Sequence, residues 1–301
     1  MPRIYFGAFF IIALSALEIW QKEEGLPNMT NNHAYHALKE SAPSKHFRVL
    51  IFYLLSLGLG LLIWQIGVLW ISDTPRRFLL PTPLEVSQRF VHLLSDGTLF
   101  YHTRVTLQEM GLGLCLGTTT ALLLGYVVAH SRILAYILEP VIITSQAVPI
   151  IALAPLLTVW FGPGLISKVF VCALIVFFPI LINVVTGLQS IETRYHNLFR
   201  LLEASRWQIL LQLEVPAAMP AFLAGLKVGG TLAGMGAVVG EFVASSEGLG
   251  YLVKQGQNLY DLPLMFVAIS ALMIIALCVY GALTLIERRL LRWHALNITT
   301  S

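Results

Sequence analysis

Charged residues are scarce in this chain. Asp, Glu, Lys and Arg make up 12% of its 301 residues and hydrophobic residues make up 57%, whereas a soluble domain carries about 25% charged residues. A protein with so few charged residues is stable where most of its surface faces hydrocarbon. Several apolar stretches reach the length of about 20 residues that a spanning helix needs. The net charge of +3 is small, and the basic residues cluster at the ends of apolar stretches, so nothing predicts nucleic-acid binding. The sequence predicts an all-α membrane protein with about six transmembrane helices.

Motifs for metal binding, ATP binding and hydrolysis are also missing. Cys115, Cys172 and Cys278 lie far apart in apolar segments without a CxxC pair, which is typical of buried small hydrophobic residues. No Walker A sequence, HExxH or GxSG is present, and His130 and His294 lie at membrane edges. We therefore expect no catalytic residue, no metal and no cofactor in this chain, and any ATPase must be a separate subunit.

The first 48 residues are predicted to be an N-terminal extension. Residues 4–20 are apolar except for Glu18. They form an extra span, a signal-like segment that follows Arg3, or a stretch translated ahead of a start near Met29.

Six apolar stretches follow within a transmembrane domain at 49–294, and residues 295–301 form a short tail. The predicted spans are 49–71, 105–129, 133–161, 165–188, 217–243 and 262–286. The second contains glycines that suit close helix packing, namely Gly111, Gly113, Gly117 and Gly125. After Pro83, apolar residues at helical spacing (Val86, Phe90, and Leu93 or Leu94) predict a short amphipathic helix. Residues 245–261 are interpreted as a polar loop.

The distribution of Lys and Arg predicts the orientation of this core. If the residues before the first span lie inside, ten basic residues from position 29 onward are inside and six are outside. The inside set is Lys39, Lys45, Arg48, Arg132, Arg194, Arg200, Arg206, Arg288, Arg289 and Arg292; the outside set is Arg76, Arg77, Arg89, Arg104, Lys168 and Lys254. Both ends of the core are therefore expected in the cytoplasm.

A long polar segment, 189–220, interrupts the apolar stretches. Ser205-Arg206-Trp207-Gln208 fits a capping box, which predicts one helix ending near Leu202 and another starting at Ser205. Pro216 and Pro220 are expected to stop or bend the second helix. Phe199 and Trp207 are large apolar anchors for a partner's groove, but the segment fits equally well an amphipathic helix that lies on lipid headgroups.

Five stretches in the same order carry a resemblance to a known family. They are FLLPTPLEV (78–86), AVPIIALAPLLTVWFGPGLISKVF (147–170), FFPILINVVTGLQSI (177–191), ASRWQILLQLEVPAAMPAFLAGLKVG (204–229) and GAVVGEFVASSEGLGYLV (236–253). Together they resemble binding-protein-dependent ABC importer permeases, in the branch that handles nitrate, sulfonates, taurine, bicarbonate and related solutes. The loop motif of that family reads EAA, three residues, Gly, about nine residues, then a hydrophobic residue, any residue, Leu and Pro.

The resemblance implies a type I importer permease fold, in which cytoplasmic coupling helices (here in the loop 189–216) dock on the ATP-binding subunit. It implies a small solute or vitamin precursor as cargo, moved by alternating access. The partners implied are ABC ATPase subunits, a second and identical permease copy, a periplasmic or lipid-anchored solute-binding protein, and membrane lipid. The implied coupling residues are Asn197, Leu198, Phe199, Glu203, Ala204, Ser205, Arg206 and Trp207.

The chain departs from the family motif at the first coupling helix. Asn197 stands at the Glu position, Leu198 and Phe199 at the Ala positions, and Glu203 at the Gly position. A glycine there ends a helix in left-handed geometry. Glu203 would cost about 1 kcal/mol in that geometry, unless the bend changes. The departures predict either a bulkier coupling surface matched to its own partner or weakened coupling.

Polar residues inside the spans are candidates for a translocation path. Lys227 lies about 16 Å along the helix from Pro216, near mid-bilayer, where charge is costly. It either faces the path and attracts an anion, or pairs within the subunit. Glu241 is expected at the outer mouth, where it gates or braces the loop that follows. Asn183 is either a polar pore group or a helix–helix hydrogen-bonding group.

The main alternative function is an autonomous secondary transporter or channel. It accounts for the spans but gives the polar segment 189–220 no purpose. An intramembrane protease is the other class considered, and it lacks its motifs.

Overall fold

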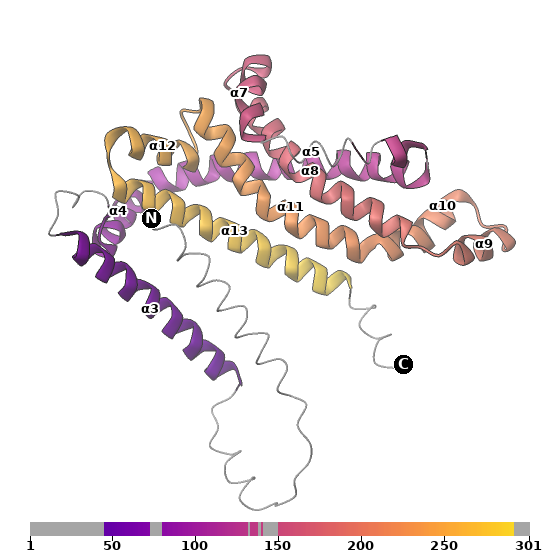
Figure 1. Ribbon diagram of the computed structural model, residues 1–301, viewed down its shortest axis with the longest axis horizontal. Helices are drawn as coiled ribbons and strands as arrows, with labels where there is room; N and C mark the ends of the chain where they lie inside the picture. Colours follow the sequence, from indigo (N-terminus) through magenta and orange to yellow (C-terminus); the bar gives the residue numbers. More distant parts are fainter. Residues whose placement is uncertain (1–44, 73–79, 132, 138–139, 141–149, 292–301) are drawn as a thin grey trace, which may run out of the picture. The chain divides into compact units, whose positions relative to one another are not determined.

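The computed structural model describes residues 45–72, 80–131, 133–137, 140 and 150–291, and the regular elements within these ranges are all helices (Figure 1). The chain divides into two units, Met1–Leu62 and Ile63–Ser301. The first unit contributes only the beginning of α3 (Lys45–Ser72) to the described residues. Residues 1–44, with the apolar stretch 4–20, and the tail 295–301 lie outside them.

Four described helices are long and apolar enough to cross a membrane. They are α5 (Thr98–His130), α8 (Leu165–Gln189), α13 (Leu262–Leu290) and a helix that runs from Arg206 to Val243, most of which is α11 (Val215–Ala244). They match the predicted spans 105–129, 165–188, 262–286 and 217–243. The predicted span 49–71 falls within α3. Of the predicted span 133–161, α7 (Ile150–Phe161) forms the end, and 141–149 lie outside the described residues.

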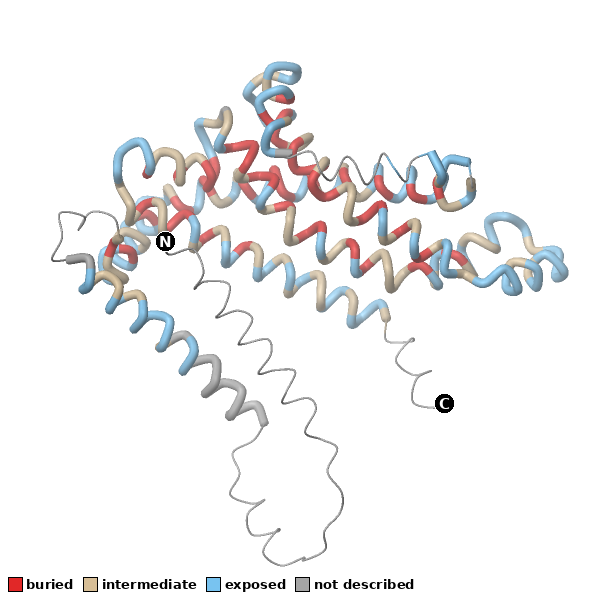
Figure 2. The backbone as a smooth tube through the Cα atoms, in the orientation of Figure 1, coloured by how far each residue is buried: buried red, intermediate tan, exposed pale blue. Residues whose placement is uncertain are grey.

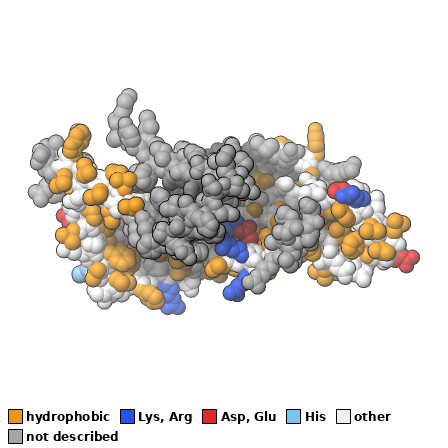
Figure 3. Space-filling model, turned by 90° about the horizontal axis from the view of Figure 1, so that it is seen from below, with side chains coloured by type: hydrophobic (Ala, Val, Ile, Leu, Met, Phe, Trp, Pro, Cys, Tyr) orange, Lys and Arg blue, Asp and Glu red, His pale blue; other side chains and the backbone are white. Residues whose placement is uncertain are grey.

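The surface of these helices is apolar over wide areas. Hydrophobic side chains make up much of the described surface in Figure 3, where charged side chains are few. Large exposed residues on α5 and α13 include Leu123 at 67% and Leu277 at 69% relative exposure. Contiguous apolar surface of this extent is unstable in water, which fits helices that contact lipid.

The core lies where α8 packs between α5 and α11. Buried residues concentrate there, as Figure 2 shows, and Cys172, Val176 and Ile180 of α8 are fully buried. A Cβ atom on Gly117 would lie 2.7 Å from the Ala173 carbonyl oxygen, and one on Gly113 would overlap Cys172. Small residues thus let the helix backbones approach closely.

The glycine prediction holds at three of its four positions. Gly125 also lies against α8, 2.8 Å from Val184 at its ideal Cβ, but Gly111 has no atom within 4 Å. Gly111 does not share the α5 face that carries Gly113, Gly117 and Gly125, since helix neighbours recur every three or four residues.

The predicted amphipathic helix is α4 (Pro83–Ser95). It begins with a capping box between Thr82 and Glu85 and has Pro83 in its first turn. Val86 and Leu93 face the core, and Phe90 packs against it. Local sequence and burial therefore specify the same helix.

One prediction about the connections is wrong, and a second is excluded in one of its two alternatives. The segment 245–261 is not all loop, because α12 (Leu249–Leu259) forms within it and buries Leu249 and Leu252. Pro216 does not stop the helix that enters the fifth span. The Val215 N–H bonds to the Leu210 carbonyl, five residues back, so the chain widens into a π-helical turn, η3 (Leu210–Glu214), and continues into α11.

The α5–α8 contact predicts opposite effects for two glycine substitutions on one helix. Gly117→Ala should lower the free energy of unfolding by about 1–3 kcal/mol, because the methyl group meets backbone that cannot rotate away. Gly111→Ala should raise it by up to about 1 kcal/mol through helix propensity alone. Thermal unfolding of the purified protein in detergent measures both, and equal shifts would contradict the packing described.

Candidate functional site

The segment between α8 and α11 folds into two short helices. They are α9 (Thr193–Leu201) and α10 (Arg206–Ile209), and they lie at one end of α5, α8 and α11 in Figure 1. Ser205 accepts the Gln208 N–H, and the Gln208 side chain accepts the Ser205 N–H. The predicted capping box and both predicted helix boundaries are confirmed.

The bend between α9 and α10 is left-handed at Glu203, with φ of 53°. The Glu203 N–H bonds to the Arg200 carbonyl and the Ala204 N–H to the Phe199 carbonyl, each at 3.0 Å. These two bonds form a Schellman motif, which usually has glycine at this position. The bend therefore keeps its geometry although the residue is Glu, at a cost of about 1 kcal/mol.

The surface of α9, the bend and α10, which we call the docking knob (residues 193–209), exposes several large apolar side chains. Trp207 is 73% exposed, Leu201 81% and Leu202 70%. Phe199, which the sequence suggested as a second anchor, is only partly exposed. The leucines were missed as anchors; Leu201 ends α9 and Leu202 is its C-cap, next to the left-handed bend.

A buried carboxylate lies where the docking knob joins the long helix. Glu214, the last residue of η3, has 5% of its side chain exposed, and its Oε1 lies 2.9 Å from His130 Nε2 and 3.3 Å from His196 Nε2. His130 ends α5 and His196 lies on α9, so one carboxylate connects three helical elements. Glu214 was not predicted as a site residue, although it is a lone acidic residue within the apolar stretch ILLQLEVP.

At the opposite end of the same helices, a larger polar network is buried. Lys168 of α8 places its Nζ 2.6 Å from Glu109 Oε1 of α5, with side-chain exposures of 9% and 0%. Glu241 of α11 interacts with Glu109 and accepts a hydrogen bond from Thr106 Oγ1 at 2.6 Å. Charges this deep are stable only when paired and hydrogen-bonded.

The network also holds the beginning of α12. Three consecutive N–H groups, of Gly248, Leu249 and Gly250, donate to His102 Nδ1, Thr106 Oγ1 and Glu241 Oε2. These are the first N–H groups of a helix, which have no partner within it. Side chains of α5 and α11 thus substitute for a local cap, and this explains why α12 was not predicted from its own sequence.

The three residues suggested for a translocation path lie apart. Glu241 is buried in the network and braces the segment before α12. Lys227 Nζ lies 2.7 Å from Glu287 Oε2 of α13. Asn183 donates to the Pro179 carbonyl of its own helix at 2.8 Å and packs against Gly225 of α11. Their assignment to a path stays a prediction.

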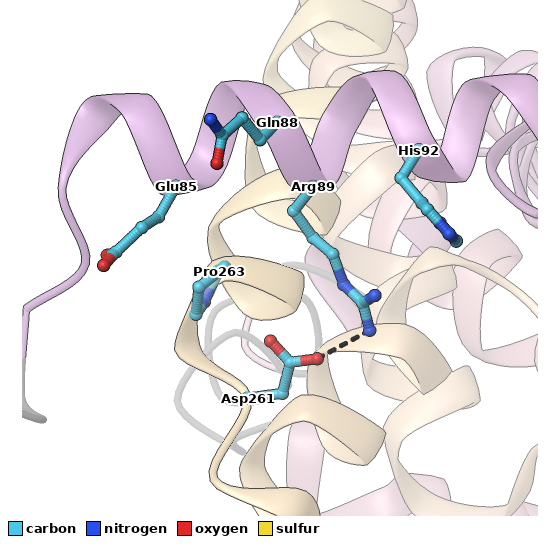
Figure 4. Close-up of a pocket in the computed structure, with 6 residues that line it drawn as sticks. All are labelled: Glu85, Gln88, Arg89, His92, Asp261 and Pro263. Atoms are coloured by element: carbon cyan, nitrogen blue, oxygen red, sulfur yellow. Dashed lines mark hydrogen bonds and ion pairs between the residues drawn. The ribbon is translucent and has the colours of Figure 1, made fainter.

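An ion pair joins α4 to the start of α13. Arg89 lies 2.7 Å from Asp261, whose other carboxylate oxygen accepts the Leu264 N–H (Figure 4). Glu85, Gln88, His92 and Pro263 surround this pair at the surface. Within the described ranges, no group of three or more His, Cys, Asp or Glu side chains is placed to hold a metal ion.

The chain matches a known protein family and a named relative in sequence. The family model described as "binding-protein-dependent transport system inner membrane component" matches residues 117–292. The chain is 46% identical over 240 residues to the riboflavin transport system permease protein RibX of Chloroflexus aurantiacus, with 80% of this chain and 89% of that protein covered.

Two further relatives have other named cargoes. The formylaminopyrimidine transport permease protein ThiX of Halalkalibacterium halodurans is 34% identical, over 78% of this chain and 92% of that protein. The putative aliphatic sulfonates transport permease protein SsuC of Bacillus subtilis is 30% identical, over 77% and 83%.

A solved structure has the same fold. In the inward-facing MetNI methionine ABC transporter, a chain matches with a TM-score of 0.56 and 20% identity, covering 63% of this chain and 94% of that one. This likeness confirms the all-helical class predicted from the sequence.

The buried network predicts an unequal cost for breaking two ion pairs. Lys168→Met leaves Glu109 buried without its counter-charge and should lower the free energy of unfolding by about 3–5 kcal/mol. Arg89→Met breaks a partly exposed pair and should cost about 1 kcal/mol or less. Thermal unfolding in detergent compares them, and a Lys168→Met loss no larger than that of Arg89→Met would contradict the network.

Proposed function

The chain belongs to the family of binding-protein-dependent transport system inner membrane components, and on that premise we propose that it carries a vitamin-like small solute into the cell as the permease subunit of an ATP-driven importer. The membership confirms the resemblance carried by the five sequence stretches, including its sulfonate branch. ATP hydrolysis is assigned to separate subunits. The proposed assembly contains two copies of this chain, two ATPase subunits and a solute-binding protein.

The observation that carries the proposal is the continuous helix from Arg206 to Val243. It begins in the docking knob, with the exposed Trp207, and ends beside the buried network at Glu241. A displacement of the knob by an ATPase subunit therefore moves one end of a spanning helix directly. In this proposal the knob and both ends of the core 49–294 lie in the cytoplasm, and the chain is a multi-pass protein of the cytoplasmic membrane.

We infer that the solute is a heterocyclic vitamin or vitamin precursor, with riboflavin as the first candidate. Of the relatives named above, the riboflavin permease RibX is 46% identical to this chain and the formylaminopyrimidine permease ThiX is 34% identical. Both are more similar to it than the sulfonate permease SsuC, at 30%. The pairing of charges supports this order. Lys168 and Lys227, the lysines of the described spanning helices, are both engaged by carboxylates, so neither is free to attract a sulfonate or nitrate.

An autonomous transporter or channel is not favoured. Such a protein has no use for a docking knob that exposes Trp207, Leu201 and Leu202 to water. An interface for a partner subunit explains that exposure, because buried aromatic anchors dominate binding energy at protein interfaces.

An uptake assay tests the function. Proteoliposomes that contain this chain and its ATPase subunits, with the binding protein added outside, should accumulate labelled riboflavin only when ATP is enclosed. Labelled taurine and nitrate serve as competing candidates for the solute. Uptake by this chain alone, driven by an ion gradient, would overturn the importer assignment.

The docking knob generates a second prediction. Trp207→Ala should weaken binding of the ATPase subunit at least about tenfold, because it removes a large exposed anchor at a proposed interface. Trp70→Ala removes a tryptophan from α3 that is more exposed than Trp207 (88% against 73%) and should leave binding unchanged. Affinity of the ATPase subunit for the detergent-purified chain measures both, and a Trp207→Ala variant with undiminished affinity and uptake would contradict the docking assignment.

A further inference from the structure

The junction between the docking knob and the membrane contains a carboxylate that the proposed function leaves without a role. Glu214 is buried at the π-helical turn, and its Oε1 faces both His130 of α5 and His196 of α9. Its other oxygen, Oε2, is buried without a hydrogen-bond partner among the described residues. The family's loop motif leaves this position open, so Glu214 is a feature of this chain rather than of the motif.

Burying an acidic group with one oxygen unsatisfied is unfavourable. Apolar residues surround it in sequence, with Leu213 before it and Val215 after it. An alanine or leucine at this position would suit a helix that enters the membrane. The contacts made by the carboxylate must therefore offset its cost, and they all lead to other helices.

The contact with His130 holds a proton. His130 Nδ1 lies 2.9 Å from the Tyr126 carbonyl oxygen, which only accepts, so Nδ1 must donate. His130 Nε2 lies 2.9 Å from Glu214 Oε1. Both contacts are hydrogen bonds at once only if the imidazole is doubly protonated or if the Glu214 carboxyl group carries the proton. In either state the pair has one proton more than a neutral histidine beside a carboxylate.

We propose that Glu214 is a positioning residue for coupling, which fastens α9 and the end of α5 to the helix that enters the membrane. This inference rests on the proposed function of the docking knob. Without Glu214, a displacement of the docking knob is transmitted only to α11, through the continuous helix. With it, α5 and α11 move together at this end, and α9 keeps its place against them. The π-helical turn sets the direction of the Glu214 side chain, because a wider turn changes the orientation of its last residue.

The shared proton gives the link a pH dependence of definite sign. The bond to His130 is complete while the proton is present and is lost as the pH rises and the pair releases it. The other titratable or charged groups that interact there are Tyr126 of α5, whose ring lies 4.3 Å from that of His130, and Arg206 of α10. Among the described residues neither forms a hydrogen bond or ion pair with Glu214, whose contacts are with His130 and His196, so neither holds the carboxylate once the proton is lost.

The test uses the complete complex in proteoliposomes, with the binding protein loaded with riboflavin or with whichever compound the uptake assay selects. The coupling ratio is the rate of ATP hydrolysis with loaded binding protein divided by the rate without it. Glu214→Gln keeps the side-chain volume and should lower this ratio at least about threefold. Glu85→Gln is the matched control, because Gln also completes the α4 capping box, and should leave the ratio unchanged.

Two further readouts separate positioning from simple loss of stability. His196→Gln added to Glu214→Gln should lower the ratio no further, because both act on one contact group. In the wild-type complex the ratio should fall from about pH 6 to about pH 9, and His130→Gln, which keeps a donor that does not titrate, should flatten this fall relative to wild type.

The outcomes are distinct. A wild-type complex without any stimulation by the binding protein overturns the proposed function, and this inference with it. A wild-type complex that couples normally while Glu214→Gln matches Glu85→Gln overturns this inference alone. If Glu214→Gln does not assemble, the pH profiles of wild type and His130→Gln decide, and identical profiles count against the link.

Discussion

The buried contact between Lys168 and Glu109 is the constraint on which the arrangement of the long helices depends. Glu109 is fully buried and the Lys168 side chain is only 9% exposed, so each requires its partner at hydrogen-bonding distance. Glu109 in turn interacts with Glu241, and Glu241 with Thr106 and the beginning of α12. Because these groups come from α5, α8, α11 and α12, satisfying one pair of charges determines the position of four helices relative to each other.

The opposite end of the same helices is built differently. There a single carboxylate, Glu214, meets two histidines that are partly exposed, and one of its oxygens has no described partner. Between the two ends, α5 and α8 touch through Gly113, Gly117 and Gly125, which contribute shape but no charge. In the proposed importer, a helix group that is held tightly at one end and loosely at the other pivots when the docking knob is displaced.

Local chemistry explains what could be predicted. The capping box at Ser205 is a property of four consecutive residues, and the left-handed bend lies at Glu203, where the family resemblance places a glycine. The segment before α12 has no such signal, because the atoms that complete its first turn belong to His102, Thr106 and Glu241. Glu109 and Glu214 were overlooked for the same reason: the partners that make a buried acid stable lie 59 and 84 residues away in the chain.

Residue composition and order by themselves determined that this chain is a helical membrane protein, where its main spans lie, and that it has a polar segment with two short helices, the second of which starts at a capping box. Periodicity and capping act over a few residues, so a linear sequence contains them in full. The tertiary structure alone decided which intramembrane charges are paired, that the helix continues through Pro216, and that Glu214 joins three helical elements. Those outcomes depend on desolvation, whose cost is defined only once distant residues have been brought together.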